Sequence, residues 1–540
     1  MKKWEKHEKN TETVSTLVYA YLFILFAGLP LYMQNKLVLI GNAKYLFFRN
    51  TTLTLGAFIV LAALWQRIRG EKKQKEKRQG RSSSDPWRIT DAFLLLYLIS
   101  AIVAYGVSPC KEDAFLGYPG WYMGLLTQTL LVGIYFAVSR YYDDSKSIWW
   151  IAGITAGIVT LIGLLNRLDI DVLGTFRGME NGEWNRTQLL STIGNNNWYA
   201  GYISVTAGIS LATAFMGERY VRALGMLGSF LFFASAITSN STTAILAACG
   251  LSLLLLLLAL RQRRRLLRAL EILMLLPLSV FMVRIFIRFH LTGLVLAGDA
   301  EKALFFTPVW YGMFAVEAAG YLILKLRERH KRADRLESGR IFKIAVSMTA
   351  AVALVMVILG GLLVAGIFSG GEKLSEIANG RLALWKVTLL TYGKEGVLFK
   401  GFGMGPDSFY YALYQWGSDA MDWINRGLLD NNVYSNAHNE WLTLLIQQGI
   451  LGVIAYGGIF ATSIKNLRRS VGKDPRALAV FLGLTGYLIC SLFTFQHVLS
   501  TPFAFALLGM ARGVFLERNI TLYHGRTDSH TIIGKVRETV

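Results

Sequence analysis

The sequence predicts an all-α membrane protein, a polytopic bundle of about 12–14 transmembrane helices with one large outward-facing loop. Three observations lead to this fold class. Of the 540 residues, 53% are hydrophobic and only 17% are charged. The apolar residues gather in runs of roughly 20, the length that crosses a bilayer. Basic residues gather directly beside those runs, as they do in the cytoplasmic loops of membrane proteins.

The apolar runs predict the spans one by one. About 14 segments are long and apolar enough, although several are short or closely joined: 16–34, 51–66, 89–107, 122–140, 148–166, 197–215, 222–239, 242–260, 270–288, 305–325, 341–367, 438–463, 477–491 and 499–516. The chain then divides into an N-terminal two-span segment with a basic linker (1–88), a transmembrane bundle (89–367), a large extracytoplasmic loop (368–437), C-terminal spans (438–516) and a tail (517–540).

Four basic clusters set the expected topology. They lie at 67–81, 261–268, 325–335 and 465–476, each against a predicted span. By the positive-inside rule they face the cytoplasm, which places both termini there in a multi-pass protein of the cell membrane. The net charge of +21 therefore indicates contact with an anionic lipid bilayer, and we expect no nucleic-acid partner.

Common catalytic and cofactor patterns do not occur in the sequence. There is no Walker loop, no H-E-x-x-H helix and no G-x-S-x-G elbow. The oxygen-rich stretches MENGE (179–183) and DNN (430–432) do not form a convergent set at metal-ligand spacing. Three scattered cysteines indicate neither a disulfide framework nor a metal cluster. We expect no metal and no cofactor.

The stretch SNAHNEWLTLLIQQGILG, which begins at Ser435, places three polar side chains where a membrane helix starts. His438 lies at the junction of the large loop with that helix, and an imidazole can take up a proton near neutral pH. Asn439 and Glu440 could fix its orientation. The alternative interpretation is a helix cap, because Asn is a good N-cap and Glu suits the first turn.

Arginines facing the same side of the membrane form a second set. They are Arg177 and Arg186 in the loop at 167–196, Arg381 in the large loop, and Arg284 and Arg288 at the end of a span. A guanidinium matches the geometry of phosphate oxygens, which indicates a phosphate-bearing lipid as a ligand. The alternatives are solvated loop charges for Arg177 and snorkelling to the interface for Arg284 and Arg288.

Several of these segments, taken in order, resemble the O-antigen ligase and polysaccharide polymerase superfamily of multi-span glycosyltransferases. AHNEWLTLLIQQGILG resembles the family's A-H-N-x-x-L element with its following G-x-x-G. NGRLALWKVTLLTYGKEGVLFKGFGMGPDSF is similar to the R-x-x-x-W helix and G-x-G turn. RTQLLSTIGNNNWYAGYI and SPCKEDAFLGYPGWYMGLL resemble two earlier outer-loop segments. The resemblance covers roughly residues 90–515.

The resemblance implies a metal-independent inverting transfer on the outer face of the cytoplasmic membrane. The donor is a polyprenyl-diphosphate-linked glycan, and the acceptor is a hydroxyl on another glycan or a surface molecule. By position His438 matches the family's loop histidine, which positions or deprotonates the acceptor. Arg381 and Arg186 match family arginines that hold the diphosphate.

Further site residues rest on weaker grounds. We expect Arg177, Arg288 and Asn439 to contribute to substrate binding, and Asn195 and Asn197 to line the sugar pocket. The chain departs from the family in two places. Thr242 and Thr243 stand in TSNSTTAIL where members often carry an arginine, and Gln448 stands where they often carry a glutamate.

The resemblance leaves open whether the enzyme is a ligase or a polymerase. A multi-span transporter or a flippase for a lipid-linked glycan is an alternative from another class. Such a protein needs polar groups in the middle of its spans and broken helices. Here most spans are clean, and the polar residues concentrate on one face of the membrane.

Overall fold

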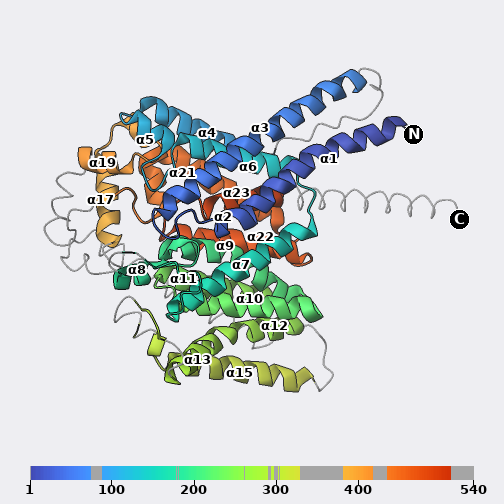
Figure 1. Ribbon diagram of the computed structural model, residues 1–540, viewed down its shortest axis with the longest axis vertical. Coiled ribbons are helices and arrows are strands. Elements are labelled where there is room, and N and C mark those ends of the chain that lie inside the picture. Colours follow the sequence, from blue (N-terminus) through green and yellow to red (C-terminus); the bar gives the residue numbers. More distant parts are fainter. Residues whose placement is uncertain are drawn as a thin grey trace, which may run out of the picture.

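A computed structural model of the chain describes residues 2–74, 88–177, 179, 182–260, 262–289, 293–296, 302, 305–328, 381–416 and 434–512. Long helices run alongside one another through most of the molecule (Figure 1). In the described residues the strands are limited to β1 (Leu189–Leu190) and β2 (Gly194–Asn195), which pair antiparallel with Leu190 opposite Gly194. The all-α fold class is confirmed.

Three sets of helices follow along the chain. The N-terminal set is α1 (Lys2–Phe23), η1 (Ile24–Gly28), α2 (Leu29–Leu31), α3 (Ile40–Gln74), α4 (Ile89–Val107), α5 (Lys111–Leu116), α6 (Leu125–Tyr141) and α7 (Lys146–Arg167). The middle set is α8 (Gly182–Gln188), α9 (Asn196–Met216), α10 (Arg219–Thr238), α11 (Thr242–Ala259), α12 (Arg263–Leu273), α13 (Leu275–Arg288) and α15 (Val309–Glu328). The C-terminal set is α17 (Arg381–Lys394), α18 (Val397–Phe402), α19 (Phe409–Trp416), α21 (Glu440–Leu467), α22 (Pro475–Ser491) and α23 (Thr501–Met510).

Ten helical segments in the described residues are long and apolar enough to cross a membrane, which confirms a polytopic membrane protein. Helices α22 and α23 are also apolar but shorter. The predicted span at 341–367 lies outside the described residues. One prediction was wrong in its extent: the span expected from residue 51 is already helical from Ile40, because α3 begins there. The charged residue Lys44 interrupts the apolar run, so the sequence did not indicate a membrane helix here. In the structure its buried ammonium donates to the carbonyls of Leu29 and Pro30.

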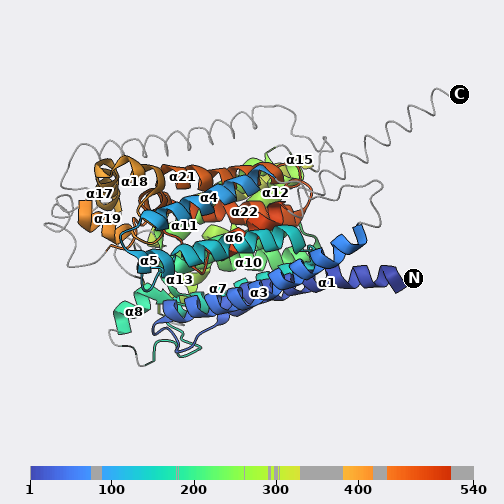
Figure 2. The same ribbon diagram turned by 90° about the horizontal axis from the view of Figure 1, so that it is seen from above.

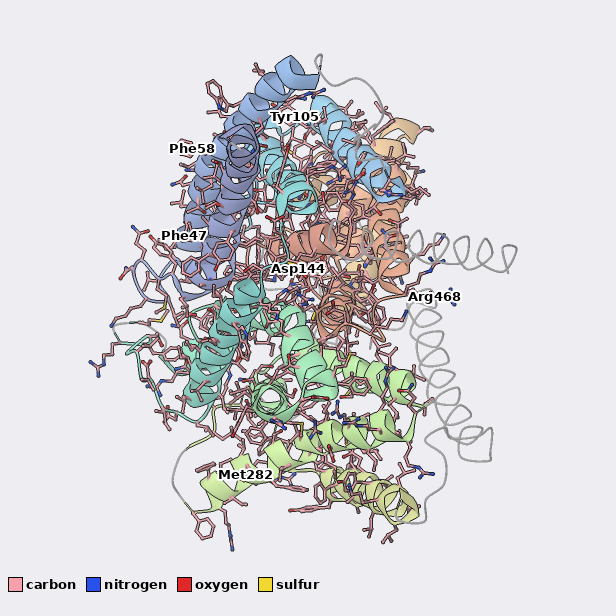
Figure 3. All side chains as sticks on the ribbon, turned by 90° about the vertical axis from the view of Figure 1, so that its right-hand side faces the viewer. Phe47, Phe58, Tyr105, Asp144, Met282 and Arg468 are labelled. Carbon is pink, nitrogen blue, oxygen red and sulfur yellow. The ribbon has the colours of Figure 1, made fainter. Side chains whose placement is uncertain are left out.

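The helix bundle has two different ends. At the first, which we call the basic end, the chain turns at 142–145, 217–218, 260–262 and 468–474. Side chains join these turns: Arg265 donates to the Gly472 carbonyl at 2.7 Å, and Arg268 to the Phe215 carbonyl at 3.0 Å. Figure 3 looks onto this end, with Asp144 and Arg468 labelled. At the opposite end, the loop end, lie the segments 108–124, 168–195, 395–408 and 434–439.

Helix α9 forms the centre of the bundle. Of its most apolar window 78% is buried, against 17% for the peripheral helices α3 and α15. It packs against α7, α10, α11 and α22. Small residues allow the closest approach, since a side chain at Gly208 would clash with the Ala479 carbonyl of α22. Such contacts hold membrane helices together where the hydrophobic effect between them is weak.

Candidate functional site

A glycine-rich turn docks on a break in α21. Gly449, inside that helix, has φ +67°, and the regular hydrogen-bond ladder stops there. The carbonyls of Ile446 and Gln447, just before the break, accept from the backbone N–H groups of Met404 and Gly405, both at 3.0 Å. The turn after α18 is therefore fixed to the membrane helix by main-chain bonds, as buried backbone groups require.

His438 is presented on a strained turn directly before α21. Its φ is +47°, a left-handed conformation that is uncommon for residues other than glycine. The turn is tied on both sides. The His438 N–H donates to Asn436 Oδ1 at 3.0 Å, and the Ala437 N–H donates to Thr443 Oγ1 at 3.0 Å. A residue held in this way is typical of functional sites.

Arg381 is brought to His438 by helix α17. Trp385 Nε1 donates to the Ala437 carbonyl at 3.0 Å, next to His438 in the chain. Arg381 precedes Trp385 by four residues and so lies on the same face of α17. Its positive charge acts on the His438 ring. Within the described part of the chain no carboxylate pairs with the Arg381 guanidinium, and burial lowers its pKa.

The His438 ring is neutral at ordinary pH. Burial, and then the charge of Arg381, lower its pKa to about 4. Its Nδ1 atom is buried and has no hydrogen-bond partner among the described residues, and the ring meets Phe495 edge-on with centroids 5.5 Å apart. A neutral imidazole with an unoccupied nitrogen can accept a proton from an incoming hydroxyl.

A small polar cavity of about 20 Å³ lies next to Phe495, which the His438 ring contacts, although His438 itself does not line it. Phe495 and Asn436 line it, together with the carboxylates of Asp407 and Glu440 and the amide of Gln496. A space of this size holds about one water molecule, which needs polar partners of this kind. The cavity is too small for a sugar.

Asp407 connects two loops at the cavity. Its carboxylate accepts from the N–H groups of Tyr118 at 2.7 Å and Met123 at 2.9 Å. Burial raises the pKa of Asp407 to about 7 despite these bonds. The segment that carries the sequence GFGMGPD is thereby anchored to the early loop at 108–124. The role of this aspartate was not predicted from the sequence.

Asn439 and Glu440 do not orient the His438 imidazole, in contrast to what the sequence led us to expect. Asn439 caps α21: it accepts from the Leu442 N–H at 3.0 Å and donates to the Leu492 carbonyl at 3.0 Å. Glu440 points into the bundle, where the hydroxyl groups of Tyr456 and Tyr487 and the Gln496 amide donate to it. The cap interpretation is confirmed for Asn439, and neither side chain bonds to the imidazole.

Arg186 and Arg177 belong to a separate part of the loop end. Arg186, on α8, forms an ion pair with Asp169 and lies over the Phe176 ring. Arg177 is exposed and packs along Gly174. No contact in the described residues joins either arginine to His438. Figure 2 shows α8 and α17 at the same end of the bundle but on opposite sides of it.

Arg288 and Arg284 differ although they share one helix. Arg288 is exposed at the end of α13, and it makes no contact with His438 in the described chain. Arg284 donates to the carbonyls of Phe305 and Thr307 and faces three aromatic rings. Its side chain therefore connects α13 to the segment before α15.

Asn195 and Asn197 stabilise the start of α9. Asn195 is the N-cap and accepts from the Asn197 N–H at 2.8 Å. The Asn197 amide accepts from the Ser241 hydroxyl at 3.0 Å. Contact with a sugar stays a prediction for both. The next residue, Trp198, contacts Trp121 edge-on, and Trp121 in turn contacts Phe495 edge-on. These rings connect the start of α9 to the residues around His438.

Sequence reasoning missed Arg167, the most buried arginine near the TSNSTTAIL stretch. It ends α7 and donates to the carbonyls of Arg186, Thr187 and Ser239. The guanidinium thereby connects the loop that precedes α9 to the end of α10. Apolar neighbours concealed this role, because the sequence cannot show which carbonyls an arginine at a helix end will reach.

The arrangement can support proton transfer beside a fixed cation. His438 is a neutral base, and Arg381 is a positive charge for which the described residues supply no carboxylate partner. In the described residues no three His, Cys, Asp or Glu side chains gather where a metal could bind. The expectation of a metal-free site stays a prediction.

Comparison with known proteins adds no identity. No protein-family model matches the chain, and no curated protein matches it either.

Proposed function

We propose that the protein transfers a glycan from a polyprenyl diphosphate to an acceptor hydroxyl on the outer face of the cell membrane. The observation that carries the proposal is the adjacency of Arg381 and His438 at the loop end. A base and a cation for a departing phosphate are the two groups that this reaction needs. The family resemblance of the two segments supports the same chemistry.

His438 and Arg381 have separate roles in this reaction. The acceptor oxygen attacks the anomeric carbon while its proton passes to a ring nitrogen of His438. The bond from the anomeric carbon to the diphosphate oxygen breaks, and the bonding electrons leave with the diphosphate. Arg381 stabilises the negative charge that develops there, and attack from the opposite side inverts the anomeric centre.

The remaining predicted residues have weaker support. Arg186 pairs with Asp169 and must exchange that partner to bind phosphate, so its role in holding the leaving group is secondary to that of Arg381. Arg177 and Arg288 are exposed and placed apart from His438. Asn439, as a helix cap, shapes the turn instead of touching the sugar.

The topology follows from the proposal. The loop end faces outward, and the basic end, which carries the clusters at 261–268 and 465–476, faces the cytoplasm with the N-terminus. A donor with a polyprenyl tail then reaches Arg381 from the outer leaflet.

A transporter or flippase would be supported by a broken helix with open carbonyl groups near mid-membrane. Helix α21 is broken at Gly449, but the carbonyls of Ile446 and Gln447 beside the break already accept from Met404 and Gly405. The break thus serves to dock the glycine-rich turn. This use of the break favours the transferase.

The test is to delete the gene and profile the chain lengths of the surface polysaccharide. Complementation uses the wild type, the variant His438→Asn and the control Lys36→Gln, an exposed cation at the same end. Asn suits the left-handed backbone at 438, so the fold should persist. Loss of long chains with single repeats retained identifies a polymerase; accumulation of unattached lipid-linked chains identifies a ligase.

Both of those outcomes support the proposal when Lys36→Gln restores the profile and His438→Asn does not. An unchanged profile in the deletion strain contradicts it. Full complementation by His438→Asn contradicts the role of the histidine.

A further inference from the structure

A large cavity in the described chain lies apart from His438, which is not among its lining residues. It has a volume of about 680 Å³ and lies between α7, α9 and α10, with the segment that begins α22 at one end. Ligand pockets commonly span roughly 300–1,000 Å³. Along α7 its lining runs from Lys146 to Thr160, which is about 21 Å of helix.

The walls of this groove suit hydrocarbon. Ile154, Leu224, Leu231 and Phe232 line it, and its apolar surface is much larger than its polar surface. Gly157 opens onto the groove, and a side chain added there would meet no neighbouring atom within 4 Å. A hollow of this kind in a membrane protein is filled by an acyl chain, because apolar walls bind water poorly.

Positive charge surrounds the mouth of the groove at the basic end. Lys146 and Lys473 line it, both exposed and without an ion-pair partner in the described residues. Arg476 also lines it but is paired with Asp144 at 2.7 Å and with Asp474 at 3.1 Å. Trp149 and Trp150 stand at the same level, as aromatic residues do at a membrane interface.

We propose that this groove binds one anionic phospholipid from the leaflet at the basic end. One acyl chain lies between α7 and α10, and the headgroup phosphate lies between Lys146 and Lys473. Basic pockets between transmembrane helices are suited to such headgroups. The inference depends on the membrane fold and not on the proposed transfer reaction.

The placement of the charges separates this lipid from the glycan donor. A polyprenyl diphosphate that reacts at Arg381 has its phosphates at the loop end of the bundle. The cations of the groove lie at the basic end, where Arg476 reaches Asp144 (Figure 3). A zwitterionic phospholipid fills the same walls but gains less from the two lysines.

The experiment measures lipid binding to the full-length purified protein by native mass spectrometry. Phosphatidylglycerol, phosphatidylcholine and undecaprenyl phosphate are titrated separately. The double variant Lys146→Gln/Lys473→Gln should weaken phosphatidylglycerol binding by roughly 30-fold, since each lysine contributes about a five-fold gain. It should leave phosphatidylcholine binding almost unchanged. Gly157→Leu should reduce binding of both phospholipids by filling the groove.

Matched controls lie outside the groove. Lys36→Gln removes an exposed lysine at the loop end, and Gly56→Leu adds a side chain where α3 has open space. Neither should change binding. Equal binding of phosphatidylglycerol to the wild type and the double lysine variant would overturn the proposal. Tighter binding of undecaprenyl phosphate than of phosphatidylglycerol in the wild type, lost in Gly157→Leu, would overturn it in favour of a polyprenyl site.

Discussion

His438 combines a strained backbone with a buried ring. Its left-handed φ costs roughly 1–3 kcal/mol, and its Nδ1 is buried with no hydrogen-bond partner in the part of the chain that the structure describes. Bonds from Asn436, Thr443 and Trp385 to the turn hold this conformation in place. The chain therefore maintains a buried imidazole that stays neutral within reach of the positive charge of Arg381.

The first prediction concerns the protonation of His438. Because burial and Arg381 lower its pKa to about 4, the ring should react with diethyl pyrocarbonate at pH 5.5 almost as fast as at pH 7. An ordinary histidine, with a pKa of about 6.5, is mostly protonated and slow at pH 5.5. Modification at His438 is measured by peptide mass spectrometry across the pH range.

The variant Arg381→Gln tests whether the charge of Arg381 contributes to the low pKa of His438. Removing the positive charge should raise the His438 pKa, but only in part, since burial is the larger cause. The same shift affects stability with a definite sign. The unfolded chain binds the proton more readily between pH 4 and 6.5, so this group makes the fold more stable as pH rises through that window. A His438 labelling profile centred near pH 6.5 in the wild type would contradict the account.

The sequence was informative at this scale where a residue's type determines its chemistry. It singled out His438 and Arg381, and the structure places them together. It could not tell that Glu440 turns inward to Tyr456 and Tyr487, because the direction of a side chain depends on the packing of three helices. The expectation that Glu440 orients the imidazole was wrong for that reason.

Helix α21 joins the membrane bundle to the site. Its first turn is capped by Asn439, and its break at Gly449 accepts the turn that follows α18. Gln448, where relatives in the resembled family often carry a glutamate, is buried at the break and accepts from the Ser100 hydroxyl at 3.1 Å. The positions of α17 and Asp407 relative to His438 depend on this joint.

The second prediction tests that joint with two glycines of one helix. At Gly449 the backbone is left-handed and an added Cβ would clash with the Gly401 carbonyl. Gly449→Ala should lower the unfolding free energy by at least roughly 1–2 kcal/mol from the backbone term alone. At Gly457 an added Cβ would meet Trp441 at 3.6 Å, an ordinary contact, so Gly457→Ala should be tolerated.

Thermal unfolding of both variants in detergent micelles provides the measurement. A clear fall in melting temperature for Gly449→Ala alone supports the joint. Equal melting temperatures for the two variants would show that the break in α21 does not depend on glycine.

The apolar runs in the sequence did not mark the helix ends where charged residues form part of the helix. Helix α12 begins at Arg263, seven residues before the span expected from 270, because its arginines lie along one side while Leu266 and Leu267 are buried. The R-x-x-x-W segment of the large loop is helical, as the resemblance implied, and forms α17 with Leu382 and Leu384 buried. The break at Gly449 was not predicted, since glycine is frequent in membrane helices and gives no sign of its φ.

Across the whole molecule, charge is distributed differently at the two ends. At the basic end Asp91 is fully buried, and Arg140 at 3.0 Å and Arg512 at 3.7 Å face it from α6 and from the residues after α23. Tyr135 also donates to this carboxylate at 2.8 Å. At the loop end the pair of Arg186 and Asp169 is largely exposed. The first group joins three helices, whereas the second joins two nearby loop positions.

The third prediction compares these two carboxylates. Asp91→Asn removes the negative charge that two guanidiniums face in the buried group, and it should reduce the unfolding free energy by roughly 3–5 kcal/mol. Asp169→Asn breaks an exposed pair and should change it by about 0–1 kcal/mol. Chemical unfolding in mixed micelles gives both values. Equal and small losses would contradict a structural role for the Asp91 group.

The overall fold was predictable because bilayer thickness imposes one length on every span and charge marks the ends. The relative placement of α8 and α17 was not, because it depends on how the intervening helices pack. The predicted meeting of Arg186 with His438 rested on motif order alone, and the described contacts give Arg186 a different partner in Asp169.

The central claim is that His438 and Arg381 transfer a lipid-linked glycan. It is tested most directly with the purified protein in liposomes, using lipid-linked glycan extracted from the deletion strain as donor and envelope extract of that strain as acceptor. Release of polyprenyl diphosphate is measured by mass spectrometry. We expect release by the wild type, and a rate about 10²–10⁴-fold lower for a folded His438→Asn variant, the usual contribution of a general base. No release by the wild type, or equal release by the variant, would contradict the account.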